Sequence, residues 1–255
     1  MVSDAVHSLS DVFATFIAFL GVRLSMKKAD KEHPYGHERL ECVASLILGA
    51  ILFFTGCGIG VSGIEKIAAG NYDQLAVPGT LALIAALVSI ISKEAMFWYT
   101  RYYAKILNSD AFMADAWHHR SDAFSSVGSL IGIGGAMLGF PVLDPIASVV
   151  ICLCILKVAF DIFKDALNKM LDTSCDEDFE NELARYISSQ EGVLHLDMLQ
   201  TRNFGSKIYI DTEIAVDGNI TLTAAHEIAE QVHAGVEKHF ENIKHIMIHV
   251  NPAVK

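Results

Sequence analysis

The chain has 255 residues, of which 52% are hydrophobic and 19% are charged, and its formal net charge is -11 at pH 7. This composition is more apolar than that of an ordinary soluble domain, so we expect the chain to lie largely in a lipid bilayer. The acidic balance argues against a nucleic-acid partner, because such a partner favours a basic patch.

Five stretches resemble membrane-spanning helices. A bilayer core about 30 Å thick needs about 20 apolar residues per helix. The first stretch is the weakest, because Asp4, His7 and Asp11 lie in its first half, and a polar membrane helix needs a protected face. We predict an α-helical membrane domain over residues 1–174, with spans at about 1–22, 40–64, 75–98, 111–138 and 143–168.

The charges between the spans predict the orientation of the chain. The segment from Arg23 to Arg39 carries five Lys or Arg residues and the segment from Lys93 to Asp110 carries three, whereas the other two connections carry one and none. Connections rich in Lys and Arg lie on the cytoplasmic side. The C-terminal segment is then cytoplasmic too, and Met1 starts on the far side with no preceding helix. We therefore expect one helix to be missing upstream, through truncation or a misassigned start.

Residues 175–255 have the composition of a soluble α+β domain. Acidic residues precede its first amphipathic helix, where they favour a helix N-terminus. The order α-β-β-α-β predicts a small ferredoxin-like sandwich. We predict helices at 178–189 and 223–240 and strands at 196–202, 207–216 and 243–250.

A ten-residue pattern occurs twice in the membrane domain. Residues 4–13 and 115–124 are identical at six of ten positions, which include every ionisable residue of the first copy. Each copy holds a His and an Asp four residues apart, and this spacing places imidazole and carboxylate on one helix face. Two such helices facing each other would form a cage of four side chains: His7, Asp11, His118 and Asp122.

This set of side chains is typical of a site for a divalent metal ion. Imidazole nitrogens and carboxylate oxygens in a set of four favour Zn²⁺, whereas Mg²⁺ and Ca²⁺ prefer oxygen-rich shells. Hydrogen bonds between helices are the alternative role, but the doubled motif favours a metal. Asp4 and Asp115, three residues before each His, could bind the metal, orient the imidazole or line a wet vestibule, and the sequence does not choose among these roles.

A second candidate metal site lies in the basic segment after the first span. In the sequence Asp30-Lys-Glu-His33-Pro-Tyr-Gly-His37, the Pro-Tyr-Gly turn brings the two histidines together, and Asp30 can join them. From these residues alone, an ordinary polar loop is an equally good interpretation.

These features together resemble a known family of transporters. The paired His-x-x-x-Asp motifs, the His-Pro-Tyr-Gly-His loop, the apolar helices and the α-β-β-α-β domain are similar to those of a cation diffusion facilitator, over nearly the whole chain. Members of that family have six membrane helices and work as homodimers. The resemblance implies that this chain corresponds to the family from its second helix onward.

The resemblance also implies which membrane and loop residues bind metal. Histidine rather than Asp at the first position of the transport site is similar to the zinc-preferring branch of the family. The family's transport site falls on His7, Asp11, His118 and Asp122, and its loop site falls on Asp30, His33 and His37.

The C-terminal domain resembles a metallochaperone-like dimerisation domain. A further carboxylate position of that domain holds Asn251 in this chain, which departs from the family's pattern. The resemblance also implies a structural charge pair between Arg39 and Asp172. We interpret His195, His233 and His245 as surface residues. The family's cytoplasmic metal positions fall on Asp197, Asp211, His226 and His249.

We therefore predict a multi-pass protein of the cell membrane that exports Zn²⁺ from the cytoplasm in exchange for protons. Metal ligands must lose their protons, so protons compete with the metal. Cd²⁺, Fe²⁺, Co²⁺ and Mn²⁺ are the other candidate cargoes, and no prosthetic group is expected. The expected partners are the metal ion, protons, the bilayer and a second copy of the chain.

Two other functional classes are alternatives to a carrier. A metal sensor or scaffold that transports nothing fits the missing helix and the candidate ligands of the cytoplasmic domain. A membrane metalloenzyme would use the His and Asp cage to activate water, but no His-Glu-x-x-His or comparable motif occurs in the sequence. We therefore predict a carrier and not an enzyme.

Overall fold

The computed structural model describes residues 2–70, 80–137, 140 and 142–253 of the chain. Within these ranges, the side chains of residues 2–10, 80–83, 85, 129, 133 and 136–137 are outside the description. The chain forms two compact units, Met1–Leu167 and Asn168–Lys255.

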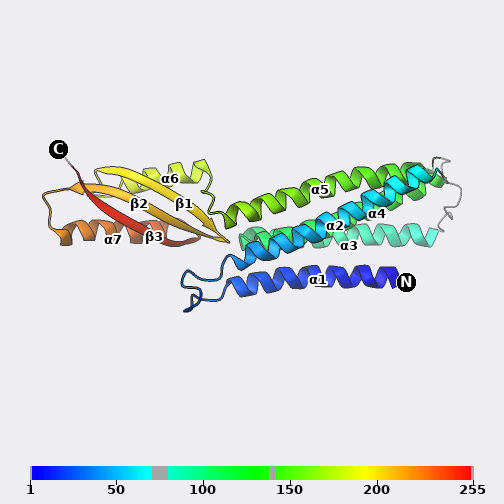
Figure 1. Ribbon diagram of the computed structural model, residues 1–255, viewed down its shortest axis with the longest axis horizontal. Helices are drawn as coiled ribbons and strands as arrows, with labels where there is room; N and C mark the ends of the chain where they lie inside the picture. Colours follow the sequence, from blue (N-terminus) through cyan, green and yellow to red (C-terminus); the bar gives the residue numbers. More distant parts are fainter. Residues whose placement is uncertain (1, 71–79, 138–139, 141, 254–255) are drawn as a thin grey trace. The chain divides into compact units, whose positions relative to one another are not determined.

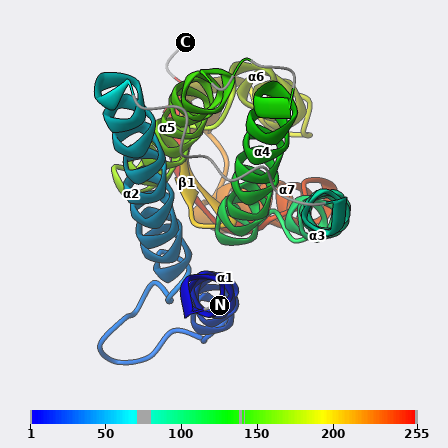
Figure 2. The same cartoon turned by 90° about the vertical axis from the view of Figure 1, so that its right-hand side faces the viewer.

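The described part of the first unit consists of five long helices that run side by side, as Figure 1 and Figure 2 show. Each predicted span falls on one of these helices, and residues 75–79 of the third span lie outside the described residues. Two helices, α2 and α5, are long and apolar enough to cross a membrane, so the crossing of the other three stays a prediction. The helices are α1 (Val2–Ser25), α2 (Leu40–Ala69), α3 (Thr80–Ile106), α4 (Asp110–Met137) and α5 (Leu143–Met170).

The connection counted from Lys93 to Asp110 is too long, because α3 continues to Ile106, beyond the predicted end of the third span at residue 98. Residues 93–106 contain no Gly or Pro that would end a helix. A helix satisfies its own backbone hydrogen bonds, so it does not need to stop where the apolar run stops. As a result, Lys93 lies inside a helix and not in a connection.

Small residues let the helices of this unit approach closely. α1 packs on α2 and α4, and a Cβ added at Gly21 of α1 would clash with Ala44 of α2. A Cβ added at Gly56 of α2 would lie 2.9 Å from Ile155 of α5. Close packing through small side chains is typical of membrane helices.

Polar and apolar side chains are distributed as expected for a protein in lipid. Large apolar side chains on the outside include Phe13 and Phe16 of α1, Phe54 of α2 and Phe160 of α5, all of which are exposed. In contrast, the buried side chains of α4 include several polar ones. Lipid cannot solvate charged groups, so the polar side chains of α4 point inward and form a polar site among the helices. The buried polar side chains of α4 are Asp115, His118, His119, Ser121 and Asp122.

The second unit holds a three-stranded sheet and two helices, which confirms the predicted order α-β-β-α-β. The sheet has the order β1-β2-β3, with β1 antiparallel and β3 parallel to β2. Asp176 caps the first helix by accepting a hydrogen bond from the backbone N–H of Phe179 at 2.9 Å. The elements are α6 (Glu177–Ser188), β1 (His195–Phe204), β2 (Lys207–Asp217), α7 (Leu222–His239) and β3 (Ile243–Ala253).

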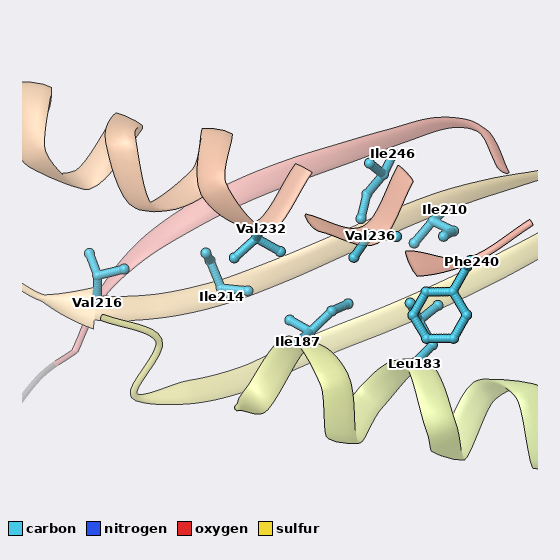
Figure 3. Close-up of a cluster of buried hydrophobic side chains, with 9 residues drawn as sticks. All are labelled: Leu183, Ile187, Ile210, Ile214, Val216, Val232, Val236, Phe240 and Ile246. Atoms are coloured by element: carbon cyan, nitrogen blue, oxygen red, sulfur yellow. The ribbon is translucent and has the colours of Figure 1, made fainter. Parts of the chain in front are cut away.

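The core of this unit forms where both helices pack on one face of the sheet. Figure 3 shows Leu183 and Ile187 of α6 and Val232 of α7 pointing toward Ile210 and Ile214 of β2. Along β2, alternate side chains face this core because successive strand residues point to opposite faces. The other face of the sheet carries the polar residues between them, so the candidate ligands of the strands lie outside the core.

Candidate metal sites

Three side chains of the predicted transport site meet between α1 and α4. In the described part of the chain, Asp11, His118 and Asp122 each offer a ligand atom within 4.8 Å of the others. Nε2 of His118 lies 3.4 Å from Oδ1 of Asp11 and 3.9 Å from Oδ2 of Asp122. His7 belongs to α1, one helical turn before Asp11, but its side chain lies outside the described residues.

Lys93 of α3 is part of the same cluster. Its ammonium group donates hydrogen bonds to Oδ2 of Asp11 and, at 2.8 Å, to Oδ2 of Asp122. The site therefore combines two carboxylates, one imidazole and one ammonium. Lys93 is absent from the predicted ligand set because its charge was assigned to a connection between spans. The helix-forming sequence on both sides of Lys93 is the signal that could have revealed its place in the site.

A second buried pair lies one turn away on α4. Asp115 accepts a hydrogen bond from the hydroxyl of Thr15 at 3.2 Å, and its Oδ2 lies 3.7 Å from Nε2 of His119. Asp115 also lines an open cavity of about 300 Å³ together with Tyr99 and Tyr103 of α3. Asp115 is therefore held by Thr15 and His119 at the wall of this cavity, which favours a supporting or vestibule role over direct ligation.

The predicted loop residues Asp30, His33 and His37 also come together, with ligand atoms within 4.8 Å of one another. The two imidazole rings lie 4.5 Å apart between centroids. Oδ1 of Asp30 accepts hydrogen bonds from the backbone N–H groups of His33 at 2.8 Å and Glu32 at 3.1 Å, which form a tight turn. Gly36, with φ of 103°, supplies the left-handed backbone that completes the turn.

The electrostatics of the loop keep its carboxylate ionised. A hydrogen bond from Lys27 and another from the backbone N–H of His33 hold the pKa of Asp30 well below its usual range. An ionised carboxylate beside two imidazoles is a ligand set that suits Zn²⁺ and similar ions.

The four predicted cytoplasmic ligands are not brought together in the same way. Asp197, Asp211, His226 and His249 lie on β1, β2, α7 and β3. Among the described residues, no three of them form a group with ligand atoms within 4.8 Å. Asp197 instead accepts a hydrogen bond from the side-chain amide of Asn251 at 3.0 Å, and His226 lies 3.7 Å from Glu230. Their binding of metal stays a prediction.

A different group forms in the second unit. His233 and Glu237 of α7 and His245 of β3 have ligand atoms within 4.8 Å of one another. The sequence analysis interpreted both histidines as surface residues. The spacing of four between His233 and Glu237 was visible in the sequence, but the approach of β3 to this side of α7 was not.

The predicted charge pair joins residues of different units. Arg39 precedes α2 in the first unit, and Asp172 follows α5 in the second. This pair stays a prediction.

Comparison with known families agrees with the described architecture. The cation efflux transmembrane domain matches residues 1–171, and the cytoplasmic domain of cation efflux proteins matches residues 175–253. The chain belongs to the cation diffusion facilitator family. It is therefore a membrane protein with a cytoplasmic C-terminal domain, in a family of divalent metal cation efflux transporters.

Relatives of this cation diffusion facilitator match nearly its whole length. The magnetosome protein MamB of Magnetospira sp. strain QH-2 is 32% identical over 252 residues, which cover 99% of this chain and 85% of MamB. The manganese efflux system protein MneP of Bacillus subtilis is 28% identical, over 98% of this chain and 85% of MneP. A cadmium form of a MamM C-terminal-domain variant is 27% identical over 31% of this chain and 98% of that domain, with a TM-score of 0.30.

Proposed function

We propose that this cation diffusion facilitator exports Zn²⁺ from the cytoplasm in exchange for protons. The proposed transport site consists of His7, Asp11, His118 and Asp122. The observation that supports it most is the meeting of Asp11 and Asp122, from two different helices, around the ammonium group of Lys93. A buried carboxylate, that of Asp122, and a half-buried one, that of Asp11, which together already bind one cation, are suited to bind another.

The charges explain why the cargo is divalent. Two carboxylates in apolar surroundings carry a charge of -2, of which the ammonium of Lys93 offsets one unit. A divalent ion that binds both carboxylates offsets both units, so the carboxylates stay neutralised when it displaces Lys93, whose ammonium must then lose its proton or turn to water. The imidazole of His118 then contributes a nitrogen ligand, which favours Zn²⁺ over Mg²⁺ or Ca²⁺.

The coordination chemistry also supports proton exchange. Carboxylates and imidazoles bind metal only in their deprotonated forms, so each metal ion that binds competes with protons for the same atoms.

The rest of the chain is assigned by the same proposal. We assign residues 1–174 to a multi-pass membrane domain and residues 175–255 to a domain that joins two copies. The match of residues 175–253 to the cytoplasmic domain of cation efflux proteins supports this assignment. The loop ligands Asp30, His33 and His37 would bind a second ion outside the bilayer.

The test of this proposal is Zn²⁺ flux into proteoliposomes with and without an imposed pH gradient. The Asp122→Asn variant removes one charge and one ligand without changing the size of the side chain. Loss of a residue that only supports a metal ligand typically lowers affinity or activity about 10 to 100-fold. Asp122 is proposed to bind the metal directly, so its loss should lower flux at least about 100-fold.

Asp161→Asn provides the matched control, because Asp161 is an exposed residue of α5 outside the ligand groups. This variant should transport Zn²⁺ as the unchanged chain does. Flux that ignores the pH gradient would contradict proton exchange, and binding of Zn²⁺ without any flux would favour a sensor.

A further inference from the structure

The helix α7 carries a stripe of alternating His and Glu residues. His226, Glu230, His233 and Glu237 are spaced by four, three and four residues, so they lie on one face of the helix. Nε2 of His233 lies 3.1 Å from Oε1 of Glu237, which is a hydrogen-bond distance. By itself this is an ordinary pair on a helix surface, and such pairs contribute little to stability.

The strand β3 adds a third side chain at one end of this stripe. The ring of His245 lies 5.9 Å from that of His233 between centroids, and both rings belong to the group that includes Glu237. The ring of Tyr209 on β2 lies 6.2 Å from His245 on another side. His245 thus has both an aromatic ring and the His233–Glu237 pair as neighbours.

Each of the three side chains is attached to backbone that the hydrophobic core holds in place. Val232 and Val236 are fully buried and immediately precede His233 and Glu237, and the buried Ile246 immediately follows His245. The three ligands themselves reach solvent, since Glu237 and His245 are exposed and His233 is partly exposed. The backbone positions are therefore fixed, while an ion can still enter from water.

We propose that His233, Glu237 and His245 form a binding site for a divalent transition metal ion of the Zn²⁺, Ni²⁺ or Co²⁺ class. Two imidazoles and one carboxylate are the ligands that these ions prefer. Bond lengths of about 2.1 Å bring tetrahedral ligand atoms to about 3.4 Å from one another, a distance the exposed ring of His245 can reach by a small movement. Water completes the shell.

This site is distinct from the three metal groups that the family resemblance implies. It includes none of Asp197, Asp211, His226 and His249, and it lies entirely in the second unit. It does not depend on the transport proposal, because a metal could bind here whether or not the membrane site moves one.

The experiment is residue-by-residue modification of histidine by diethyl pyrocarbonate, read by mass spectrometry on the full chain in detergent, with and without Zn²⁺. Metal-bound nitrogen cannot be modified, so Zn²⁺ should slow modification of His233 and His245 at least about tenfold. His239 is an internal control on the same helix, because its ring stacks on Tyr186 outside the group. Equal modification of His233 and His245 with and without Zn²⁺ would overturn the proposal.

A pair of variants separates specific binding from general attraction of cations. Glu237→Gln removes a ligand charge, whereas Glu230→Gln removes the same charge about two turns away, beside His226. We expect Glu237→Gln to raise the Zn²⁺ concentration for half-protection about tenfold and Glu230→Gln to leave it unchanged. An equal shift in both variants would contradict a defined site. Because wild-type protection is measured first, the result does not depend on either variant folding well.

Discussion

The two units place the same types of ligand in opposite surroundings. In the first unit, His118 and Asp122 are buried and large apolar side chains face outward, whereas in the second unit the apolar side chains form the core and His233 and Glu237 lie outside it. The ammonium group of Lys93 is bonded to the buried carboxylate of Asp122 and to the half-buried carboxylate of Asp11. Charged ligands that are buried therefore need an opposite charge beside them, whereas ligands at a solvent-exposed surface need only a backbone that is held in place.

The largest expected effect concerns the core of the second unit. Leu183→Ala should lower the free energy of unfolding of this unit by about 3 kcal/mol, because it removes buried methyl groups and leaves a cavity. Leu222→Ala is the matched control, since Leu222 is 87% exposed and should cost less than about 0.5 kcal/mol. Denaturant unfolding, followed by far-UV circular dichroism, measures the free energy of unfolding of both variants. Equal losses in the two variants would show that the core does not carry the stability of the unit.

The next prediction concerns the charge compensation of the buried site. Lys93→Met removes the ammonium that a divalent ion would have to displace, so Zn²⁺ affinity at the membrane site should rise about 10 to 100-fold, or about 1.4 to 2.7 kcal/mol. Lys105→Met, at an exposed position in the last turn of the same helix, should leave affinity unchanged. Equilibrium Zn²⁺ binding in detergent gives the comparison. A fall in affinity for Lys93→Met would mean that Lys93 organises the site and does not compete with the metal.

An effect of similar size is expected from the packing of α1 on α2. Gly21→Ala should lower stability by about 1 to 3 kcal/mol, because the added methyl would overlap with Ala44. Gly58→Ala should stabilise α2 by up to about 1 kcal/mol, since nothing lies within 4 Å of a Cβ at that position. Thermal unfolding in one detergent tests the pair. If both variants behave alike, α1 does not pack at the described distance.

The smallest effect is expected at Cys175, near the start of the second unit. Burial raises the pKa of the Cys175 thiol, so less of it is the reactive thiolate at pH 8. Alkylation by iodoacetamide should be at least about threefold slower than at a cysteine introduced by Ser174→Cys in a Cys175→Ser background, because Ser174 is exposed. The rate at Cys175 should rise with pH until the thiol ionises. Rates that agree at pH 8 would contradict the burial of this thiol.

Much of the fold followed from local patterns in the sequence. The helices of the membrane unit and the order of elements in the second unit were predictable because hydrophobic periodicity reports which side of an element is buried. The meeting of Asp11 with His118 and Asp122 was predicted from the repeated motif, since equal spacing on two helices places both pairs on matching faces. The end of α3 was not predictable in this way, because the apolar run ends before the helix does.

The parts that the sequence did not predict depend on contacts between elements. Lys93 was counted as a charge of a connection, and only the packing of α3 beside α1 and α4 reveals that its ammonium reaches two carboxylates. Likewise, the approach of His245 to His233 depends on the placement of β3 beside α7, which no spacing along the chain specifies. Tertiary contacts of this kind must be seen in three dimensions.

The most direct test of the central claim is X-ray absorption spectroscopy at the zinc edge on the Zn²⁺-loaded chain. The other candidate ligand groups would first be removed by His33→Ala and His37→Ala in the loop, His233→Ala and His245→Ala in the α7–β3 group, and His226→Ala and His249→Ala among the predicted cytoplasmic ligands. Our account predicts one bound ion with two imidazole nitrogens and two carboxylate oxygens at about 2.0–2.2 Å, which Asp122→Asn abolishes. A shell without imidazole nitrogen, or one that persists in Asp122→Asn, would contradict the assignment of the transport site.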